Sequence, residues 1–524
     1  MINEALLLYT GRAERRWKQA LKNPEIAQRN VLKRILRLQS THPQLTSGNW
    51  QDWQENWQSL PLLTYEETGL PERSLTYQTP RCYETTSGSS GAKKQIPYTP
   101  ALLQSFTEMF LIWTHDVLRF LKQRGTPFTG GQIYISVSPQ FKDSAEGLAD
   151  DSDYLTGFTG WLSQHYLAVP SSVRHLQHPQ SFWDVVSLSL LRSPTLEIVS
   201  VWSPSFWRVL QRHMITHRER LVELLAQQEL TYENQRFVLP VPPPVRCREL
   251  REALQALPET WAWRMCFPHL KFISCWGAEN ARADFRAICQ DFPAVHVQEK
   301  GLLATEAPLT IPSEKYGGFL PLLHEVFFEF LPEMGNSPQR PLQLHELEEG
   351  AYYEVVISQK GGLLRYRLKD RVQVTGKYGK TPFLRFCGRS ENVSDLVGEK
   401  LNAAYVVEGV QKLYPQHKLC LIPDGRAHDK NSEAGYVLLS KKPLNPDALE
   451  DYFCRAFHYG NARKLGQLRP LRHHAHPDIF EHLTRFFVEK RHMKRGDLKD
   501  QVLYTREHTG ELLDYLAGSL GASF

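Results

Sequence analysis

The segment from Glu84 to Pro97, ETTSGSSGAKKQIP, holds the residues best suited to bind a polyphosphate. Its threonines, serines and glycines precede two lysines, so hydroxyls and backbone N–H groups can surround phosphate oxygens while a cation approaches from one end. It does not match the loop of the P-loop NTPases, because no Ser or Thr follows either lysine to bind magnesium. Taken alone, this composition is more often that of a flexible surface loop.

Length and composition limit the class of protein. At 524 residues the chain exceeds what one hydrophobic core usually supports, which predicts two or more folding units. The net charge of +5 is small and the basic residues are scattered, so no nucleic-acid partner is expected. The oligomeric state stays open, with a monomer slightly favoured.

Cysteine usage and hydropathy bear on the compartment. The eight cysteines occur singly, without a C-x-x-C pair, which favours reduced thiols. No apolar run approaches the ~18 to 20 residues that a membrane span needs. We therefore expect a cytoplasmic protein that acts on small molecules, without a membrane partner.

The elements that must position the phosphate-binding segment alternate between helix and strand, which predicts an α/β fold. After Thr99-Pro100, apolar residues recur with the period of an amphipathic helix. Short β-branched runs predict buried strands. These strands are expected at 132–138, 196–202 and 269–276, and further helices at 205–230 and 281–290.

From residue 350 onward the sequence becomes β-like, and strands are expected at 351–358, 361–368 and 371–376. A seam is expected at the Gly388-Arg389-Ser390-Glu391 segment. The predicted domains are a large N-terminal one, 1–388, and a smaller α+β one, 389–524, with a hinge near Glu391.

Six segments occur in the order expected of the GH3 auxin-responsive-promoter family of the adenylate-forming superfamily. They are ETTSGSSGAKKQIP, KFISCWGAEN, KGLLATEAPLTIP, VFFEF, GGLLRYRLKDRVQVTG and LRFCGRSENVSDLVGEKLN. The chain resembles that family strongly from about residue 80 to about 410 and more weakly beyond. The resemblance implies a large α/β domain of the adenylate-forming type, a smaller, mobile C-terminal domain, and ATP with Mg²⁺ as cofactors.

The resemblance also implies roles for individual residues around ATP. Trp276, Gly277 and Ala278 match the segment whose backbone packs on adenine, although a plain strand-to-helix turn has the same signature. The family's phosphate-binding loop, whose hydroxyls and amides hold the β- and γ-phosphates, is matched by Thr85, Thr86, Ser87, Ser89, Ser90, Lys93 and Lys94.

Two acidic residues complete the implied nucleotide site. Thr305 and Glu306 match the family's Thr-Glu pair, in which the carboxylate binds Mg²⁺. Asp370 of YRLKD corresponds to the carboxylate that accepts both ribose hydroxyls. Lys369 stands where the family usually has glycine, which puts the turn before Asp370 in doubt.

The C-terminal part supplies further implied residues. Arg389 matches an arginine that contacts the nucleotide at the domain junction, and Glu391 occupies the hinge position, although both are also compatible with a solvated salt bridge. A catalytic lysine of the small domain corresponds to Lys494 or Lys499. We prefer Lys499, because Gly496-Asp497-Leu498 can present it on a turn; a merely solvated surface lysine is the alternative.

The predicted function is that of an ATP-dependent ligase that activates a carboxylic acid as acyl-AMP and transfers the acyl group to an amine, expected to be that of an amino acid. A thioester-forming synthetase and a catalytically inactive nucleotide-binding protein are the alternatives. The acyl pocket is expected from the helix at 101–122 and the segment 150–170, with Phe158, Trp161 and Tyr166 as walls. The identities of the acid and the amine stay open.

Overall fold

The computed structural model divides into two compact units, the first reaching Phe386 and the second beginning mainly at Cys387. The boundary predicted between residues 388 and 389 stays a prediction. The residues that the structure describes are 2–38, 57–58, 60–70, 76–85, 94–136, 166–278, 281–332, 340–389, 393–394, 396, 399, 401–425, 434–464, 468–491, 493, 498, 500–505 and 509–521.

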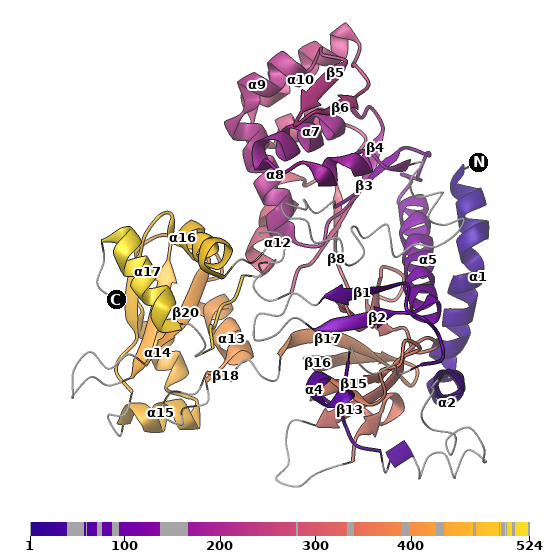
Figure 1. Ribbon diagram of the computed structural model, residues 1–524, viewed down its shortest axis with the longest axis vertical. Coiled ribbons are helices and arrows are strands. Elements are labelled where there is room, and N and C mark those ends of the chain that lie inside the picture. Colours follow the sequence, from indigo (N-terminus) through magenta and orange to yellow (C-terminus); the bar gives the residue numbers. More distant parts are fainter. Residues whose placement is uncertain are drawn as a thin grey trace. The chain divides into compact units, whose positions relative to one another are not determined.

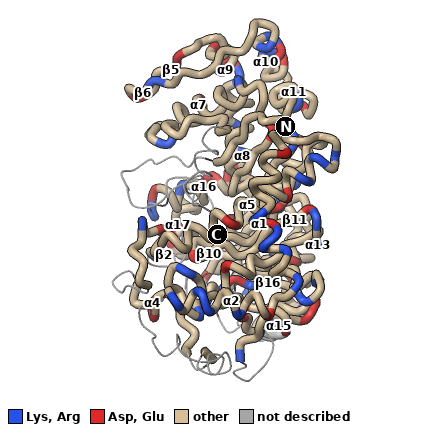
Figure 2. Tube along the Cα trace, turned by 90° about the vertical axis from the view of Figure 1, so that its right-hand side faces the viewer, with Lys and Arg blue, Asp and Glu red and all other residues tan. Residues whose placement is uncertain are grey.

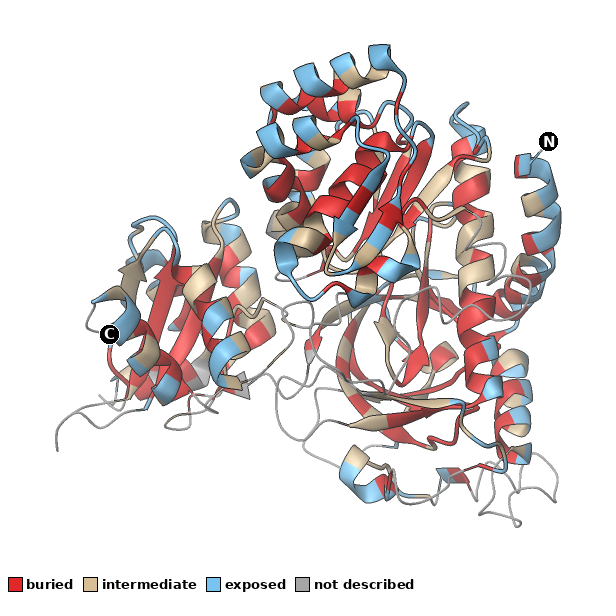
Figure 3. Cartoon of the chain, turned by 45° about the horizontal axis from the view of Figure 1, so that its top comes forward, coloured by how far each residue is buried: buried red, intermediate tan, exposed pale blue. Residues whose placement is uncertain are grey.

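The first unit contains a parallel sheet of order β3-β4-β7-β8 (Figure 1). Its strands are β3 (Gln132–Ile135), β4 (Leu196–Ser200), β7 (Phe272–Cys275) and β8 (His296–Glu299). Every residue of β4 and β7 is buried, as expected of central strands covered on both faces. Figure 3 shows this contrast between buried strands and helices with exposed outer faces. The strands predicted within 132–138, 196–202 and 269–276 are confirmed.

Helices cover this sheet. They are α7 (Pro179–Arg192), α8 (Pro204–Thr216), α9 (Arg218–Leu224), α10 (Pro244–Ala256), α11 (Thr260–Cys266) and α12 (Arg282–Asp291). The helix predicted at 281–290 is confirmed by α12. The core between helices and sheet includes Trp207 and Trp263, both fully buried.

The single helix predicted over 205–230 is wrong. The helix is interrupted at His217 and ends at Leu224, and β5 (Glu229–Tyr232) then pairs with β6 (Gln235–Val238). The hairpin turn holds Glu233 at φ 51° and Asn234 at φ 63°, the left-handed backbone that a two-residue turn requires.

The first unit also contains a five-stranded sheet of order β14-β13-β15-β16-β17. Its strands are β13 (Phe327–Pro332), β14 (Leu342–Gln343), β15 (Tyr352–Ser358), β16 (Tyr366–Tyr378) and β17 (Thr381–Arg389). The strand predicted at 351–358 is confirmed, and the one predicted at 371–376 lies within β16. Of the strand predicted at 361–368, only residues 366–368 belong to β16, and residues 361–365 are not in a strand. A bulge explains the misreading: Glu354 pairs with Arg371 and Val356 with Arg367, so β16 carries extra residues.

The N-terminal part of the same unit includes the helices α1 (Ile2–Lys22), α2 (Pro24–Arg37), α4 (Tyr65–Thr68) and α5 (Pro100–Gln123). Helix α5 is the one predicted after Thr99-Pro100, and the Thr99 hydroxyl caps it by accepting from Leu102 N over 3.2 Å. Its buried face includes Leu103 and Phe106. Helix α5 follows β2 almost directly. The packing of α5 therefore fixes the position of the C-terminal end of the phosphate-binding segment.

The second unit is an α+β module. Its mixed sheet has the order β20-β21-β22, formed by β20 (Leu419–Asp424), β21 (Gly435–Ser440) and β22 (Arg472–Ala475). Alternate residues of β20 and β21 belong to two different apolar clusters, so both faces of the sheet are covered. The covering helices are α13 (Ala403–Leu413), α14 (Asp447–Phe453), α15 (Phe457–Lys464), α16 (Ile479–Arg485) and α17 (Thr509–Leu520).

Three further observations concern hydropathy, cysteines and charge. Among the described residues, no helix is both long and apolar enough to cross a membrane. All eight cysteines are free thiols, as predicted. Figure 2 shows basic and acidic residues interspersed along the described trace.

Candidate active site

The ends of the phosphate-binding segment are held together by a hairpin. Strand β1 (Cys82–Thr85) pairs with β2 (Gln95–Tyr98), and Thr85 lies opposite Gln95. Lys94, directly before β2, therefore lies near the point where the segment begins. The side chain of Thr85 and the predicted phosphate ligands Thr86, Ser87, Ser89, Ser90 and Lys93 lie outside the described residues.

A tyrosine joins this segment to the predicted magnesium-binding carboxylate. Lys94 Nζ donates to the Tyr366 hydroxyl over 3.2 Å, and that hydroxyl donates to Glu306 Oε1 over 3.2 Å. Tyr366 is fully buried and Glu306 is 7% exposed, whereas Lys94 is half-buried. The ammonium also lies 5.8 Å from the ring centroids of both Tyr65 and Tyr366. Three segments distant in sequence thus meet at one hydroxyl.

Thr305 and Glu306 form the tip of a tight hairpin. Strand β9 (Leu303–Ala304) pairs with β10 (Ala307–Pro308), with Ala304 opposite Ala307, which leaves the predicted pair as the two turn residues. The Tyr98 hydroxyl donates to the Thr305 carbonyl over 2.8 Å. The tip is therefore held from β2 through Tyr98 and from β16 through Tyr366.

Asp370 lies in the bulge of β16. Lys369, which replaces the family's glycine, has φ 62°, so the backbone keeps the left-handed conformation that glycine adopts without cost. For a residue with a Cβ this conformation costs about 1 to 2 kcal/mol. Asp370 itself is 4% exposed. The bulge is therefore present although a lysine occupies its left-handed position.

The segment Trp276-Gly277-Ala278 follows β7. Gly277 is required sterically, because a Cβ there would lie 2.8 Å from Glu299 Cγ and 3.0 Å from Phe285 Cδ2. The Trp276 ring is stacked on Trp202, with centroids 5.9 Å apart, and Ala278 is buried. The packing of this backbone on adenine stays a prediction.

The remaining predicted site residues cannot be placed. The backbone of Arg389 ends β17, but its side chain is not described, and Glu391, Lys494 and Lys499 lie outside the described residues. The same holds for the predicted wall residues Phe158 and Trp161. The third, Tyr166, packs edge-to-face on Phe128 with ring centroids 6.0 Å apart.

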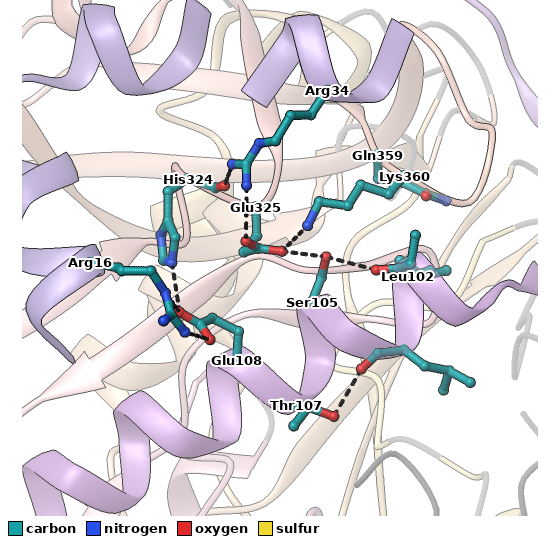
Figure 4. Close-up of polar contacts among 12 residues, drawn as sticks. Arg16, Arg34, Leu102, Ser105, Thr107, Glu108, His324, Glu325, Gln359 and Lys360 are labelled. Carbon is teal, nitrogen blue, oxygen red and sulfur yellow. Dashed lines mark hydrogen bonds and ion pairs between the residues drawn. The ribbon is translucent and has the colours of Figure 1, made fainter. Parts of the chain in front are cut away.

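A buried polar network ties together the elements that carry the site (Figure 4). Glu325, in the loop before β13, accepts from the Lys360 ammonium and from Ser105 Oγ of α5, the latter over 2.8 Å. Arg34 of α2 lies 3.9 Å from the same carboxylate. Lys360 belongs to the turn between β15 and β16, so this network links α5 to the strand that carries Tyr366 and Asp370.

A second carboxylate extends the network. Glu108 of α5 lies 3.2 Å from His324 Nε2 and accepts from Arg16 Nε over 3.0 Å. Burial opposes ionisation of Glu108, but the hydrogen bonds with His324 and Arg16 outweigh it and lower its pKa to about 2. Glu108 is therefore a carboxylate throughout the neutral range and anchors α5 to α1.

Sequence reasoning missed Tyr98, Tyr366 and the network of Glu325. Tyr366 lies inside the quoted YRLKD motif, and a buried tyrosine hydroxyl usually needs a partner, so that motif held a usable signal. The network carried no local signal, because Ser105 and Glu325 are 220 residues apart in the chain.

Glu306 could hold a cation that arrives with a nucleotide. No three His, Cys, Asp or Glu residues gather at metal-binding distance within the described ranges. Mg²⁺ at nucleotide sites commonly has one or two protein carboxylates, with phosphate oxygens and water as its other ligands. A single buried carboxylate fits that donor set.

Comparisons with known proteins agree with these motifs. The model of the GH3 family N-terminal domain matches residues 13–293, and that of the GH3 family central domain matches residues 319–389. Among solved structures, GH3.15 acyl acid amido synthetase is similar with a TM-score of 0.76 and 18% identity, over 95% of this chain and 94% of that chain.

Curated relatives match over shorter stretches. Indole-3-acetic acid-amido synthetase GH3.3 of Arabidopsis thaliana is 33% identical over 106 residues, which is 20% of this chain and 18% of that protein. A GH3 domain-containing protein of Homo sapiens is 30% identical over 166 residues, 30% of this chain and 31% of that protein. The matches thus span less than a third of the length of these relatives.

Proposed function

Because this chain belongs to the GH3 family, we propose that it is an ATP-dependent ligase that joins a carboxylic acid to the amine of an amino acid. The acid is first activated as acyl-AMP, and the acyl group then passes to the amine. Similar proteins named as amido synthetases support this reaction, and the shared fold supports the adenylate-forming architecture.

The observation that carries the proposal is the contact of Lys94, Tyr366 and Glu306. These residues come from three motifs. The family resemblance implies that one binds phosphates, one binds the nucleotide and one binds the metal. Their side chains meet although 272 residues separate Lys94 from Tyr366. A purely structural hydrogen bond would not require that all three partners come from nucleotide motifs.

In the first step, a carboxylate oxygen of the acid attacks the α-phosphorus of ATP, and the bond to pyrophosphate breaks. Lys94 supplies positive charge near the phosphates, and Tyr366 orients the Glu306 carboxylate. Glu306 would hold Mg²⁺, which neutralises phosphate charge when bound. Asp370 accepts the ribose hydroxyls and so fixes the nucleotide.

In the second step, the amine nitrogen attacks the acyl carbonyl, AMP leaves with its bonding electron pair, and the nitrogen loses a proton. No covalent enzyme intermediate is required, because adenylation already provides a good leaving group. Cys275, next to Trp276, is an unsuitable nucleophile, since burial raises the pKa of its thiol to about 12.

We propose roles also for the predicted site residues whose side chains lie outside the described residues. The predicted phosphate ligands bind ATP, Arg389 contacts the nucleotide, and Lys499 acts in adenylation. A small domain, 389–524, rotates about Glu391 between the two steps. The protein acts in the cytoplasm.

The test is carboxylate-dependent exchange of labelled pyrophosphate into ATP over a panel of small acids. Amino acids, hydroxylamine and coenzyme A are then offered as competing acceptors. We expect exchange and an amide product with at least one acid and amino acid. A coenzyme A thioester as the sole product would replace the amide ligase by a thioester synthetase. If no acid supports exchange, the alternative of a catalytically inactive nucleotide-binding protein would replace the ligase.

A further inference from the structure

A tyrosine outside the six family motifs binds the end of the phosphate-binding segment. The Tyr65 hydroxyl accepts from Gln95 N over 2.7 Å and donates to Gln95 O over 3.2 Å. A phenol can do both, because it carries one O–H donor and also accepts. One hydroxyl therefore binds both backbone polar groups of the residue that follows Lys94.

Tyr65 is itself fixed to the strand that carries Tyr366. It is the first residue of α4 and follows Leu63 by two residues. Leu63 N donates to Arg365 O over 2.9 Å, and Arg367 N donates to Leu63 O over 2.8 Å. This parallel bridge holds the segment to β16 next to Tyr366. The two tyrosines therefore come from backbones that are hydrogen-bonded to each other.

The Lys94 ammonium lies near the rings of both tyrosines. Its Nζ is 5.8 Å from each ring centroid, and cation–π attraction acts up to about 6 Å. It also donates to the Tyr366 hydroxyl over 3.2 Å. We call Tyr65, Lys94 and Tyr366 the tyrosine clamp. Because an ammonium has three N–H donors, Lys94 can bind phosphate oxygens while it keeps its hydrogen bond with Tyr366.

The tyrosine clamp orders a side chain that would otherwise have many rotamers. Ordering a lysine when a ligand binds costs conformational entropy. Contacts that order Lys94 before ATP arrives lower this cost and so raise the affinity for phosphate. Tyr65 contributes in two ways, since its hydroxyl fixes Gln95 and its ring lies near the ammonium. Lys94 is only half-buried, so part of its side chain is open to solvent.

We propose, on the premise of the function above, that Tyr65 is a positioning residue for the phosphates of ATP. It fixes Gln95 and, together with Tyr366, holds Lys94 in the position from which the ammonium binds phosphate oxygens. Tyr65 contacts neither the substrates nor the reacting atoms, so its effect on ATP passes through Lys94.

Nucleotide binding without an acid tests this proposal. Calorimetry measures the affinities for Mg·ATP and for AMP, because AMP lacks the β- and γ-phosphates. Lys94→Met should reduce the preference for ATP over AMP by about tenfold. Tyr65→Phe keeps the ring and should reduce it by about threefold, whereas Tyr65→Leu removes ring and hydroxyl and should reduce it by about fivefold. An unchanged preference in both Tyr65 variants, or no preference in the unmodified protein, would refute the proposal.

A double-variant cycle distinguishes positioning from a merely structural role. Adding Tyr65→Leu to Lys94→Met should not reduce the preference further, because Tyr65 acts through Lys94. Reductions that multiply would show that Tyr65 acts independently of Lys94 and would overturn the proposal. The same cycle with Tyr65→Phe replaces this measurement if thermal unfolding shows that Tyr65→Leu does not fold.

Tyr353→Phe is the matched control for loss of a hydroxyl. The Tyr353 hydroxyl also binds a backbone group, accepting from Glu348 N over 3.0 Å, and its ring packs edge-to-face on Phe330 in the core. Its substitution should leave the preference for ATP over AMP unchanged. A loss as large as that in Tyr65→Phe would show that the effect is not specific to Tyr65 and would contradict the proposal.

Pyrophosphate exchange is measured separately in the same proteins. An effect of Tyr65 on the ATP preference that depends on Lys94, without exchange for any acid, would refute the proposed ligase function alone. Exchange in the unmodified protein, together with Tyr65 and Lys94 effects that multiply, would refute this inference alone.

Discussion

Two carboxylates of the first unit, Glu325 and Glu306, are almost equally buried, at 6% and 7% exposure, yet they differ in their neighbours. Glu325 accepts from the Lys360 ammonium and a serine hydroxyl inside the polar network of Figure 4. Glu306 accepts from the neutral hydroxyl of Tyr366, which also binds half-buried Lys94. A carboxylate neutralised by a buried lysine serves the fold. For Glu306 we propose a different role, which is to bind the cation that arrives with the nucleotide.

The largest effect expected from this comparison is on stability, at Lys360. Lys360→Met leaves Glu325 buried without its ammonium partner, so the free energy of unfolding should fall by about 3 to 5 kcal/mol. Urea denaturation measures the change. Lys380→Met is the control, because its partner Glu25 lies 2.8 Å away on the surface, and it should cost less than about 1 kcal/mol.

A double variant sharpens the result. Lys360→Met with Glu325→Leu removes both charges and should regain part of the loss, because no unpaired carboxylate stays buried. A single variant within about 1 kcal/mol of the unmodified protein would contradict the role given to this network.

Acid should weaken the same network through Glu108. Its pKa is lowered to about 2 in the folded protein, so its contribution to stability is present above the unfolded pKa and is lost as pH falls from about 4.5 towards 2. The loss should be roughly 2 kcal/mol, since one pKa unit corresponds to about 1.4 kcal/mol and water screens half-exposed Arg16.

Urea denaturation at pH 6 and pH 3 measures this dependence in the unmodified protein, in Glu108→Gln and in the exposed control Glu349→Gln. Glu108→Gln should lose less stability on acidification than the other two. Equal slopes in all three proteins would show that Glu108 does not contribute.

At the candidate site we expect a loss of activity with little change in stability. Glu306→Gln and Asp370→Asn should each reduce pyrophosphate exchange by at least about tenfold, equivalent to ~1.4 kcal/mol of lost transition-state stabilisation. Their unfolding free energies should stay within about 1 kcal/mol of the unmodified protein. Unmodified exchange in either folded variant would refute the assignment of that residue. In Glu306→Gln it would also remove the distinction between Glu306 and Glu325.

The smallest effect concerns the bulge next to Asp370. Lys369→Gly relieves a left-handed residue at φ 62° and should raise the unfolding free energy by about 0.5 kcal/mol, because glycine's unfolded-state entropy offsets part of the gain. Arg365 has φ 45° but donates to Glu329 over 3.1 and 2.9 Å. Arg365→Gly should therefore destabilise by several kcal/mol. Destabilisation of similar size at both positions would show that side-chain contacts outweigh backbone conformation at Lys369 also.

The elements best predicted from sequence were those with strong periodicity and clear boundaries. Helix α5 begins at the predicted Thr99-Pro100 cap, and β4 and β7 are the predicted apolar runs. The hairpin of β5 and β6 was missed, because left-handed Glu233 and Asn234 carry little sequence signal. Strand β16 was divided in two, because its bulge falls on charged residues that resemble a turn.

For the candidate site, the order and spacing of motifs predicted Glu306, Asp370 and Gly277, and their roles stay predictions. These motifs are local, since a glycine at a close backbone approach or an acid at a turn tip is visible within a few residues. Their partners were not identified. Tyr98 meets Thr305 from 207 residues away, and Ser105 meets Glu325 from 220 residues away.

The sequence by itself therefore determined the family, the alternation of helices and strands, and the segments that could do chemistry, because these depend on short-range periodicity and local backbone requirements. The tertiary structure alone decided which buried charges neutralise one another and which hydroxyl joins Lys94 to Glu306. Those pairings arise when packing brings distant segments together, and chain spacing does not encode that packing in a readable form.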